Sequence, residues 1–264
     1  MTAELVSTAV AERSTDRSAV ALSEVSKVFG RGTASVHALD QVSLRVKPGE
    51  FVCLVGASGC GKSTLLSLVA GLDQPTVGHI DVEGGVTPAL MFQDPALFPW
   101  LTVAGNVGLP LRLRKLPRPE REARVRELLS TVHLEEFARR RPHELSGGMR
   151  QRAALARTLG LDSSVLLMDE PFGALDAMTR DILHDEVERI WIQRRLAVLF
   201  VTHNVREAAR LGDRIVLLSS RPGRVVWERA VDVPRPRRID SPEVAAIAAE
   251  VTDRLRQEVR RHGR

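Results

Sequence analysis

The stretch from Gly56 to Thr64 reads GASGCGKST and has the residue types and spacing of a loop that binds phosphate groups. It fits the pattern G-x-x-x-x-G-K-[ST], with Gly56, Gly61, Lys62 and Ser63 in register. The glycines allow the backbone to curl so that successive N–H groups point inward, and the following helix adds the positive end of its dipole. Lys62 would reach the β- and γ-phosphates of a nucleotide, and Ser63 would ligate Mg²⁺.

A second group of chemically active residues ends the apolar run VLLMDEP, Val165 to Pro171. Four apolar residues bring Asp169 to the end of a buried strand, where its carboxylate can hold Mg²⁺ through the metal's water shell. Glu170 follows, in a position to polarise an attacking water molecule. Taken alone, the two could be solvated acids at a strand end. Together with Lys62 and Ser63 they imply Mg²⁺-dependent hydrolysis of ATP.

The stretch LSGGMRQR, Leu145 to Arg152, contains no histidine, carboxylate or cysteine. Ser146, Gly147 and Gly148 begin the helical run MRQRAALARTLG, so free N–H groups and the helix dipole would be available at this helix start. By itself this is an ordinary serine-capped helix. Because the acidic strand end follows shortly afterwards, we expect the stretch to serve a site that it does not itself contain.

The flanking patterns supply the strands and helices that would position these residues. Residues 21–29 and 36–46 alternate apolar and polar side chains like half-buried strands, separated by the glycine turn GRGTA. FVCLVG, directly before the phosphate loop, is a continuous apolar run typical of a strand buried on both faces. A chance match of the loop pattern is expected in roughly one chain of this length in a hundred, and this strand–loop–helix context disfavours it.

Composition limits the broad class of protein. Of the 264 residues 44% are hydrophobic, and no apolar run approaches the roughly 20 residues that cross a bilayer. Cys53 and Cys60 cannot form a disulfide framework or a zinc site on their own. The net charge of +5 would suit nucleic acid. The basic residues lack interleaved aromatic residues, however, so a membrane surface, a protein partner or solvation explains them as well.

Six motifs in a fixed order resemble the ATP-binding cassette (ABC) family of transporter ATPases. They are GASGCGKST, MFQD, LSGGMRQR, VLLMDEP, GALD and VTHN, and the resemblance covers about residues 20 to 220. LSGGMRQR is the most specific of them, because many other phosphate-loop ATPases share only the phosphate loop and the acidic strand end. The resemblance implies an α/β fold with a phosphate-loop NTPase core, a RecA-like mixed sheet flanked by helices. It adds an antiparallel β subdomain and an inserted helical subdomain.

The resemblance also divides the chain into parts. It implies the ABC ATPase domain at residues 21–225, with the helical subdomain at about 95–160. The polar and small residues before this domain predict a mobile N-terminal leader at residues 1–20. A C-terminal strand and an amphipathic helix, opened by Ser241 and Pro242, would occupy residues 226–264.

Site residues carry over from the family position by position. In ABC ATPases two copies pack head to tail, so that the signature of one closes over the ATP, bound with Mg²⁺, on the phosphate loop of the other. The implied ATP-binding residues are Phe29, Gly56, Ala57, Ser58, Gly59, Cys60, Gly61, Lys62, Ser63 and Thr64. The implied signature residues are Leu145, Ser146, Gly147, Gly148 and Met149. The catalytic residues would be Glu170, His203 and Gln93, the metal ligands Ser63, Gln93 and Asp169, and the residue that couples the two sites Asp176.

Some positions depart from the family pattern or have simpler explanations. Met149 stands where many members have glutamine, which should matter little if backbone N–H groups do the binding. Gly173 stands where serine is frequent, so a hydrogen bond across the dimer would be missing. The chain has no tyrosine, so stacking on adenine falls to Phe29, which could instead be a core residue at a strand end. Gln93 could be a surface residue, and His203 a structural one.

Between Gln93 and Leu145, spaced apolar residues and dense charge predict helices. In the family this region carries a groove that accepts a short helix from a membrane permease. DPALFPW, at its start, is unusually apolar for a loop. We expect Phe98 and Trp100 to divide between core packing and docking, with Trp100 the better contact candidate.

The stretches MFQDPALFPWLTVAGNV, DEPFGALDAMTR and LSSRPGRV resemble the importer ATPases for nitrate, aliphatic sulfonates, taurine and related solutes. The resemblance implies a peripheral subunit at the cytoplasmic face of the membrane, bound to permease subunits and served indirectly by an extracytoplasmic solute-binding protein. Aliphatic sulfonate is the leading solute, with nitrate or taurine as alternatives.

Two other functions have weaker support from the sequence. Cassette ATPases that act on nucleic acid or ribosomes carry inserted coiled coils, zinc cysteines or two cassettes, and none of these features is present, so no nucleic-acid partner is expected. A regulatory module without turnover is disfavoured because Glu170 and His203 stand in catalytic positions.

Overall fold

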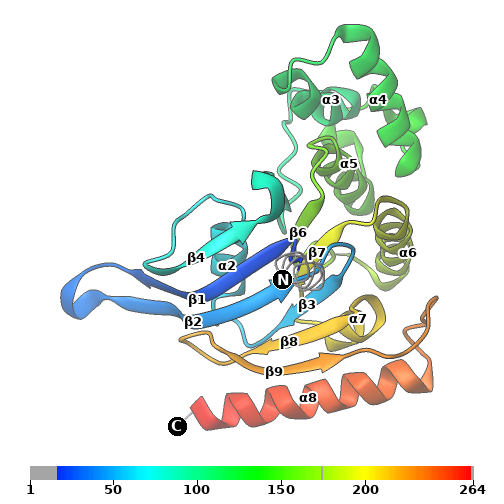
Figure 1. Ribbon diagram of the computed structural model, residues 1–264. Helices are drawn as coiled ribbons and strands as arrows, with labels where there is room; N and C mark the ends of the chain where they lie inside the picture. Colours follow the sequence, from blue (N-terminus) through cyan, green and yellow to red (C-terminus); the bar gives the residue numbers. More distant parts are fainter. Residues whose placement is uncertain (1–16, 174, 263–264) are drawn as a thin grey trace, which may run out of the picture.

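A six-stranded mixed sheet forms the centre of the structure, a computed structural model that describes residues 17–173 and 175–262 (Figure 1). In the order in which they lie in the sheet, the strands are β5 (Ala89–Met91), β6 (Val165–Asp169), β7 (Ala197–Val201), β3 (Phe51–Val55), β8 (Arg214–Leu218) and β9 (Val225–Ala230). Neighbours run parallel, except that β9 runs antiparallel to β8. The predicted mixed sheet is confirmed.

Strand β3 shows how the sequence determines that both faces of the central sheet are covered. Every residue of FVCLV is buried. Phe51, Cys53 and Val55 belong to one hydrophobic core, whereas Val52 and Leu54 belong to another. Because successive residues of a strand point to opposite faces, a strand that is covered on both faces must be apolar throughout. The expectation of a doubly buried strand before the phosphate loop is therefore confirmed.

A three-stranded antiparallel sheet lies beside the central one. Its strands, in order, are β2 (Val36–Val46), β1 (Val20–Phe29) and β4 (Val77–Val82). The two alternating segments read from the sequence are both strands, joined through the short 3-10 helix η1 (Gly32–Ala34), and β4 is followed by a second one, η2 (Glu83–Gly85). Helix α2 (Lys62–Val69) contacts both sheets and shares one core with them. The antiparallel β subdomain is thus present as expected.

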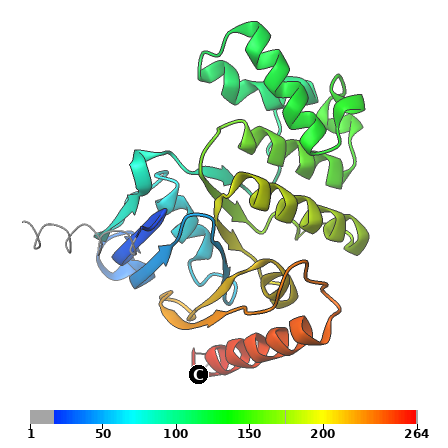
Figure 2. The ribbon, with the colours of Figure 1, turned by 45° about the vertical axis from the view of Figure 1, so that its right-hand side comes forward.

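The chain between β5 and β6 is helical and stands above the sheet (Figures 1 and 2). It contains α3 (Val103–Leu113), α4 (Arg118–Thr131) and α5 (Gly147–Leu159), with the short helices η3 (Glu135–Phe137) and η4 (Pro142–Glu144) between the last two. Helix α3 begins at Thr102, whose side chain accepts a hydrogen bond from Gly105 N–H at 3.1 Å. The inserted helical subdomain is confirmed, while its bounds at about residues 95 and 160 stay a prediction.

Three further helices follow the signature region. Helices α6 (Ala177–Arg194) and α7 (Val205–Leu211) and the C-terminal helix α8 (Pro242–His262) contribute to the core on the face of the sheet opposite α2. Ser241 Oγ accepts a hydrogen bond from Val244 N–H at 3.3 Å, so α8 opens as its sequence predicted. Helix α8 lies along β9, at the end of the molecule away from α3 and α4 (Figure 2).

Two expectations concern the ends and the membrane. Residues 1–16 of the predicted leader lie outside the described residues, and β1 already begins at Val20. Over residues 17–173 and 175–262, no helix combines the length and the apolar character that a membrane crossing requires.

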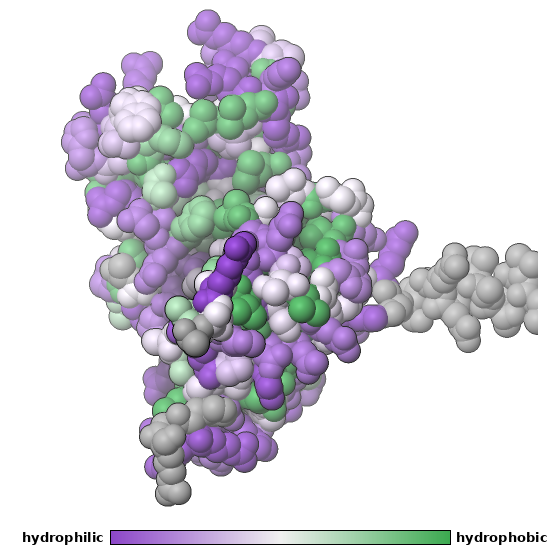
Figure 3. Space-filling model, turned by 90° about the vertical axis from the view of Figure 1, so that its left-hand side faces the viewer, coloured by the Kyte–Doolittle hydropathy of each residue, from purple (hydrophilic) through white to green (hydrophobic). Residues whose placement is uncertain are grey.

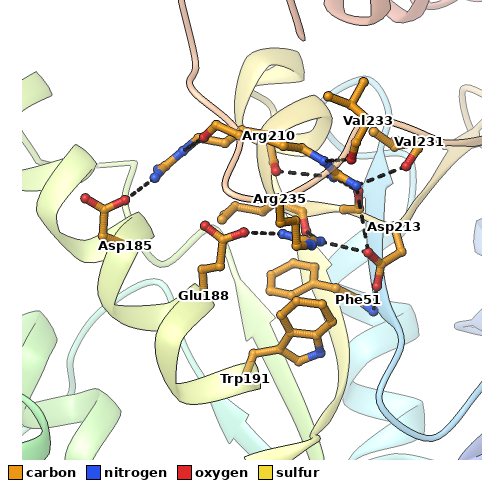
Figure 4. A network of polar contacts seen from close by, with 12 residues as sticks. Phe51, Asp185, Glu188, Trp191, Arg210, Asp213, Val231, Val233 and Arg235 are labelled. Atoms are coloured by element: carbon orange, nitrogen blue, oxygen red, sulfur yellow. Dashed lines mark hydrogen bonds and ion pairs between the residues drawn. The ribbon is translucent and has the colours of Figure 1, made fainter. Parts of the chain in front are cut away.

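A buried arginine holds the segment that leads from β9 to α8 (Figure 4). Arg237 is 5% exposed and donates hydrogen bonds to the carbonyl oxygens of Val233 (2.7 Å), Val231 (3.0 Å) and Gly212. Arg210, also buried, donates in turn to the carbonyl oxygen of Arg237 at 3.2 Å. The backbone of this irregular segment therefore finds its partners in side chains rather than in a sheet.

A second arginine of the segment reaches α6. The Arg235 guanidinium lies over the Trp191 ring, 4.3 Å from its centre, and pairs with Glu188 at 2.5 Å and Asp213 at 2.8 Å. Because stacking and ion pairing act on the same planar group, Arg235 ties the C-terminal segment to the body of the protein.

Replacing Arg237 with alanine should lower the free energy of unfolding by about 2–4 kcal/mol, since several buried carbonyl groups lose their donor. Arg238 offers a matched control, because its side chain is 81% exposed and pairs with Asp240. Arg238→Ala should change stability by less than about 0.5 kcal/mol. Urea unfolding of both variants measures the difference, and equal losses would contradict this account of the segment.

Candidate active site

The phosphate loop lies between the end of β3 and the start of α2, and two of its glycines, Gly56 and Gly61, sit where a side chain does not fit. Gly61 has φ of 102°, and a Cβ built on it would lie 2.7 Å from Leu39 Cδ2. A Cβ on Gly56 would lie 2.8 Å from Cys60 Sγ. Lys62 is buried, and its ammonium group donates hydrogen bonds to the carbonyl oxygens of Gly56 at 2.9 Å and Ala57 at 3.0 Å. The loop therefore wraps around the lysine that would bind phosphate.

A cavity of about 250 Å³ opens at this loop, and we call it the phosphate cavity. It is lined by Phe29, Val36, Ala38, Ser58, Gly59, Gly61, Lys62, Ser63, Thr64, Glu170 and Arg221. Phe29 is 43% exposed at the end of β1, where an aromatic face is available to a base. Cys60 does not line the cavity. Its thiol is buried, and burial raises its pKa.

Asp169 ends β6 beside Ser63. The Ser63 side chain lies close enough to the Asp169 carboxyl to affect its pKa. Burial raises the pKa of the Asp169 carboxyl, the Ser63 contact opposes this shift, and the neighbouring Glu170 carboxylate adds to it. A half-buried carboxylate next to a hydroxyl fits Mg²⁺, because the cation would compensate the charge and usually completes its shell with water and substrate phosphate. Ser63 and Asp169 are therefore suited to hold the metal.

Glu170 is held in an unusual backbone conformation. Its φ is 44°, in the left-handed region that non-glycine residues rarely occupy, and its N–H donates to the Val201 carbonyl at 2.9 Å. Its Oε2 lies 2.8 Å from Nδ1 of His203, which follows β7. The structure thus brings together the proposed base and the histidine, although 33 residues separate them in sequence.

Gln93 approaches the same pair. A Cβ built on Gly173 would lie 3.6 Å from His203 Cε1, 3.6 Å from the Glu170 carbonyl oxygen and 3.9 Å from Gln93 Nε2. These separations are ordinary contacts, so a serine side chain would also fit at this position. The side chains of His203 and Gln93 therefore both approach Gly173, in the loop that follows Glu170.

Gln151 is a residue that the sequence analysis did not single out. Its buried amide Nε2 donates to the carbonyl oxygens of Gln93, at 3.1 Å, and Pro171. It joins the signature helix α5 to the loops that carry Gln93 and Glu170. The available signal was a polar residue on the apolar side of a predicted helix, three residues after Gly148.

The signature, Leu145 to Met149, lies elsewhere on the surface of the chain. Ser146 caps α5 by accepting a hydrogen bond from Met149 N–H at 3.3 Å. Of the described residues that line the phosphate cavity, none belongs to the signature. Gly147 instead lines a separate pocket with Gln93, Gln151 and Leu175. A single chain therefore does not bring the signature and the phosphate loop together.

The need for glycine at position 148 has a cause that the sequence did not reveal. A Cβ built on Gly148 would lie 2.3 Å from Cγ2 of Thr179, which is on α6 of the same chain. Two carbon atoms cannot approach each other so closely, so Thr179 would have to move. A Cβ on Gly147 would make an ordinary contact, 3.6 Å from Leu175 Cδ2. Crowding within the chain therefore restricts Gly148, and not Gly147.

Asp176 caps α6. Its Oδ1 accepts a hydrogen bond from Thr179 N–H at 3.0 Å, and its Oδ2 accepts one from the Thr179 hydroxyl at 2.7 Å. These hydrogen bonds lower the pKa of the Asp176 carboxyl. Its predicted role in coupling two sites stays a prediction.

Gly148→Ala should lower the free energy of unfolding by about 1–3 kcal/mol, because the new methyl group displaces Thr179. Adding Thr179→Ser should restore most of this loss, since serine keeps the hydroxyl on Asp176 and lacks Cγ2. Thermal unfolding of the single and double variants measures the rescue. Gly147→Ala serves as control and should remain close to wild type in stability. An unrescued double variant would show that the Thr179 contact is not the cause.

Comparison with known proteins places this geometry in a family. Residues 39–173 match the family model of the ABC transporter. The chain is 46% identical to the taurine import ATP-binding protein TauB of Burkholderia pseudomallei, over 80% of this chain and 84% of that protein. It is 44% identical to the nitrate import ATP-binding protein NrtD of Synechocystis sp., over 81% and 82%. For the aliphatic sulfonates import ATP-binding protein SsuB of Bacillus licheniformis, the identity is 42%, over 85% and 89%.

A solved structure supports the same conclusion. The dimeric structure of MJ0796, a bacterial ABC transporter cassette, has a TM-score of 0.72 and 34% sequence identity, and the match covers 81% of this chain and 100% of that one. The expected fold class is confirmed. The chain therefore belongs to the ABC transporter family and is one of its ATP-hydrolysing subunits.

Proposed function

We propose that the chain drives import of a small anion or organic solute through a separate membrane permease. The observation that carries the proposal is the Glu170–His203 contact at the phosphate cavity, which supplies a hydrolytic centre in a chain whose relatives are import ATP-binding proteins. Import requires a subunit that turns over ATP, and the contact between Glu170 and His203 supports such a role.

The predicted site residues divide the chemistry among them. Lys62 and the N–H groups of the phosphate loop would bind the β- and γ-phosphates. Ser63 and Asp169 would hold Mg²⁺, which supplies neutralisation of the phosphate charge during transfer. Glu170 would polarise the attacking water, and His203, through its hydrogen bond, would hold the Glu170 carboxylate in place. Gln93 would contact the metal or the same water from the adjoining loop.

A second copy would complete the site. The phosphate cavity of about 250 Å³ is smaller than most pockets for small ligands, which measure about 300–1,000 Å³. Its lining, over the described part of the chain, includes no signature residue, while a dimeric cassette structure matches this fold. We infer a head-to-tail dimer in which Ser146 and Gly147 present the start of α5 to the partner's ATP.

A groove between α3 and α4 is suited to the permease. It measures about 580 Å³ and is lined by apolar residues that include Leu101, Leu109 and Val125, with Arg112, Arg118, Arg121 and Arg126 around them. Figure 3 shows hydrophobic side chains exposed among hydrophilic ones at this helical end of the molecule. Such a groove would accept a short amphipathic helix, which would hold the subunit at the cytoplasmic face of the membrane.

We propose a class of solute rather than a single compound. Taurine, nitrate and aliphatic sulfonates, the solutes in the names of three relatives, are small and bear an anionic group. Identities of 42%, 44% and 46% are too similar to choose among them. We keep aliphatic sulfonate as the leading candidate and propose that an extracytoplasmic solute-binding protein delivers the solute to the permease.

Glu170→Gln should lower kcat by at least about 100-fold and keep ATP binding, because only the water-polarising carboxylate is lost. The ATP-bound variant should accumulate as a dimer in light scattering. Adding Lys62→Ala should abolish that dimer by preventing ATP binding. A Glu170→Gln protein that binds ATP and remains monomeric would contradict the composite site.

Trp100→Ala should uncouple hydrolysis from transport. Trp100 is 68% exposed and rests against Phe98, with ring centres 5.4 Å apart, while the backbone of Phe98 is fixed by Asn106 at 2.7 Å. The variant should therefore keep its fold and basal ATPase activity and lose solute-stimulated ATPase in the membrane complex.

A matched control for this test is Val226→Ala, on an exposed position of β9. It should leave both activities unchanged. If Trp100→Ala instead removed basal activity and stability together, the residue would be part of the core and the docking assignment would be wrong.

A further inference from the structure

Arg221 lines the phosphate cavity, although it lies in the loop after β8, outside the phosphate loop, the acidic strand end and the signature. Its Nε donates a hydrogen bond to the Gly59 carbonyl at 3.3 Å. A Cβ built on Gly59 would lie 3.6 Å from Arg221 Nη2. We propose that Arg221 is a further ATP-binding residue that contacts the phosphate groups of the nucleotide held by its own chain.

The loop that carries Arg221 is firmly placed. Its ends are joined by the hydrogen bond from Ser219 N–H to the Arg224 carbonyl at 2.9 Å, and Ser219 Oγ donates to the Pro222 carbonyl at 2.7 Å. Gly223 N–H donates to the Ala38 carbonyl at 2.9 Å, which attaches the loop to β2 next to the phosphate loop. Little ordering is therefore needed to keep Arg221 at the cavity.

Within residues 17–173 and 175–262, no ion pair joins Arg221 to a carboxylate. Its recorded hydrogen-bond acceptor in the described part of the chain is the neutral Gly59 carbonyl. Arg224, three positions along, instead forms an ion pair with Asp40. A guanidinium has five N–H donors, so four stay available to an anion. Together with Lys62 it gives the cavity two cationic groups against one carboxylate, that of Glu170, which favours a polyphosphate.

The contact with Gly59 indicates the phosphate chain rather than the base. Gly59 belongs to the loop whose N–H groups would surround phosphate, whereas the aromatic face available to adenine is that of Phe29. An arginine next to Gly59 would add charge-assisted hydrogen bonds at the same place. This inference rests on the proposed nucleotide site, so its test includes a variant of that site.

The test compares Arg221→Ala with Arg224→Ala, a neighbouring arginine engaged by Asp40. Calorimetric titration should show that Arg221→Ala weakens ATP binding by about tenfold, the loss expected for a charge-assisted contact. Arg221→Lys should recover part of the affinity, and Arg224→Ala should stay within about twofold of wild type. Binding of adenosine, followed by ligand-observed NMR, and the thermal midpoint should be the same in wild type and Arg221→Ala.

Three results would overturn the proposal in distinguishable ways. If Lys62→Ala weakens ATP binding and Arg221→Ala does not, the nucleotide site stands and Arg221 is not part of it. If adenosine binding weakens as much as ATP binding, Arg221 contacts the base and the phosphate assignment is wrong. If Lys62→Ala also leaves ATP binding unchanged, the proposed nucleotide site itself fails.

Discussion

The parallel register of three strands is the constraint on which the site depends. In the sheet, Val201 of β7 pairs with Asp169 of β6 on one side and with Leu54 of β3 on the other. The carboxyl ends of the three strands therefore reach the same edge, where open α/β sheets place their ligands. The phosphate loop, the Asp169–Glu170 pair and His203 each follow one of these ends. The residues proposed for hydrolysis lie together at this edge because the three strands are aligned.

The helical subdomain, which contains α3, α4 and α5, is connected to this edge of the sheet by specific hydrogen bonds as well as by apolar packing. Gln151 on α5 bonds to the backbone of Gln93 and Pro171, and Arg157 on the same helix donates to the carbonyl oxygens of Pro95, at 2.8 Å, and Ala96, at 2.6 Å. A displacement of α5 would therefore move the loop that carries Gln93. This connection would give the proposed docking groove and the proposed hydrolytic centre a physical path between them, which transport driven by ATP requires.

The motifs were readable from sequence because their chemistry is local. The glycines of the phosphate loop, the serine cap at Ser146 and the buried strand FVCLV each follow from a few consecutive residues. Thr179, which restricts Gly148, and Arg221, at the phosphate cavity, depend on segments that only the fold brings together. Arg237 and Arg210 add to the positive charge of the sequence, yet in the structure they donate hydrogen bonds to backbone carbonyls. Their role could not be inferred from charge alone.

The central claim, that two chains complete each ATP site, is tested most directly by mixing two inactive variants. Lys62→Ala disables the phosphate loop, and Ser146→Arg disables the signature. In a mixed dimer one site would combine the intact phosphate loop of one chain with the intact signature of the other. The account predicts that mixing restores ATPase activity, up to roughly a quarter of the wild-type rate for random pairing and independent sites. A mixture as inactive as either variant alone, although it forms mixed dimers, would contradict it.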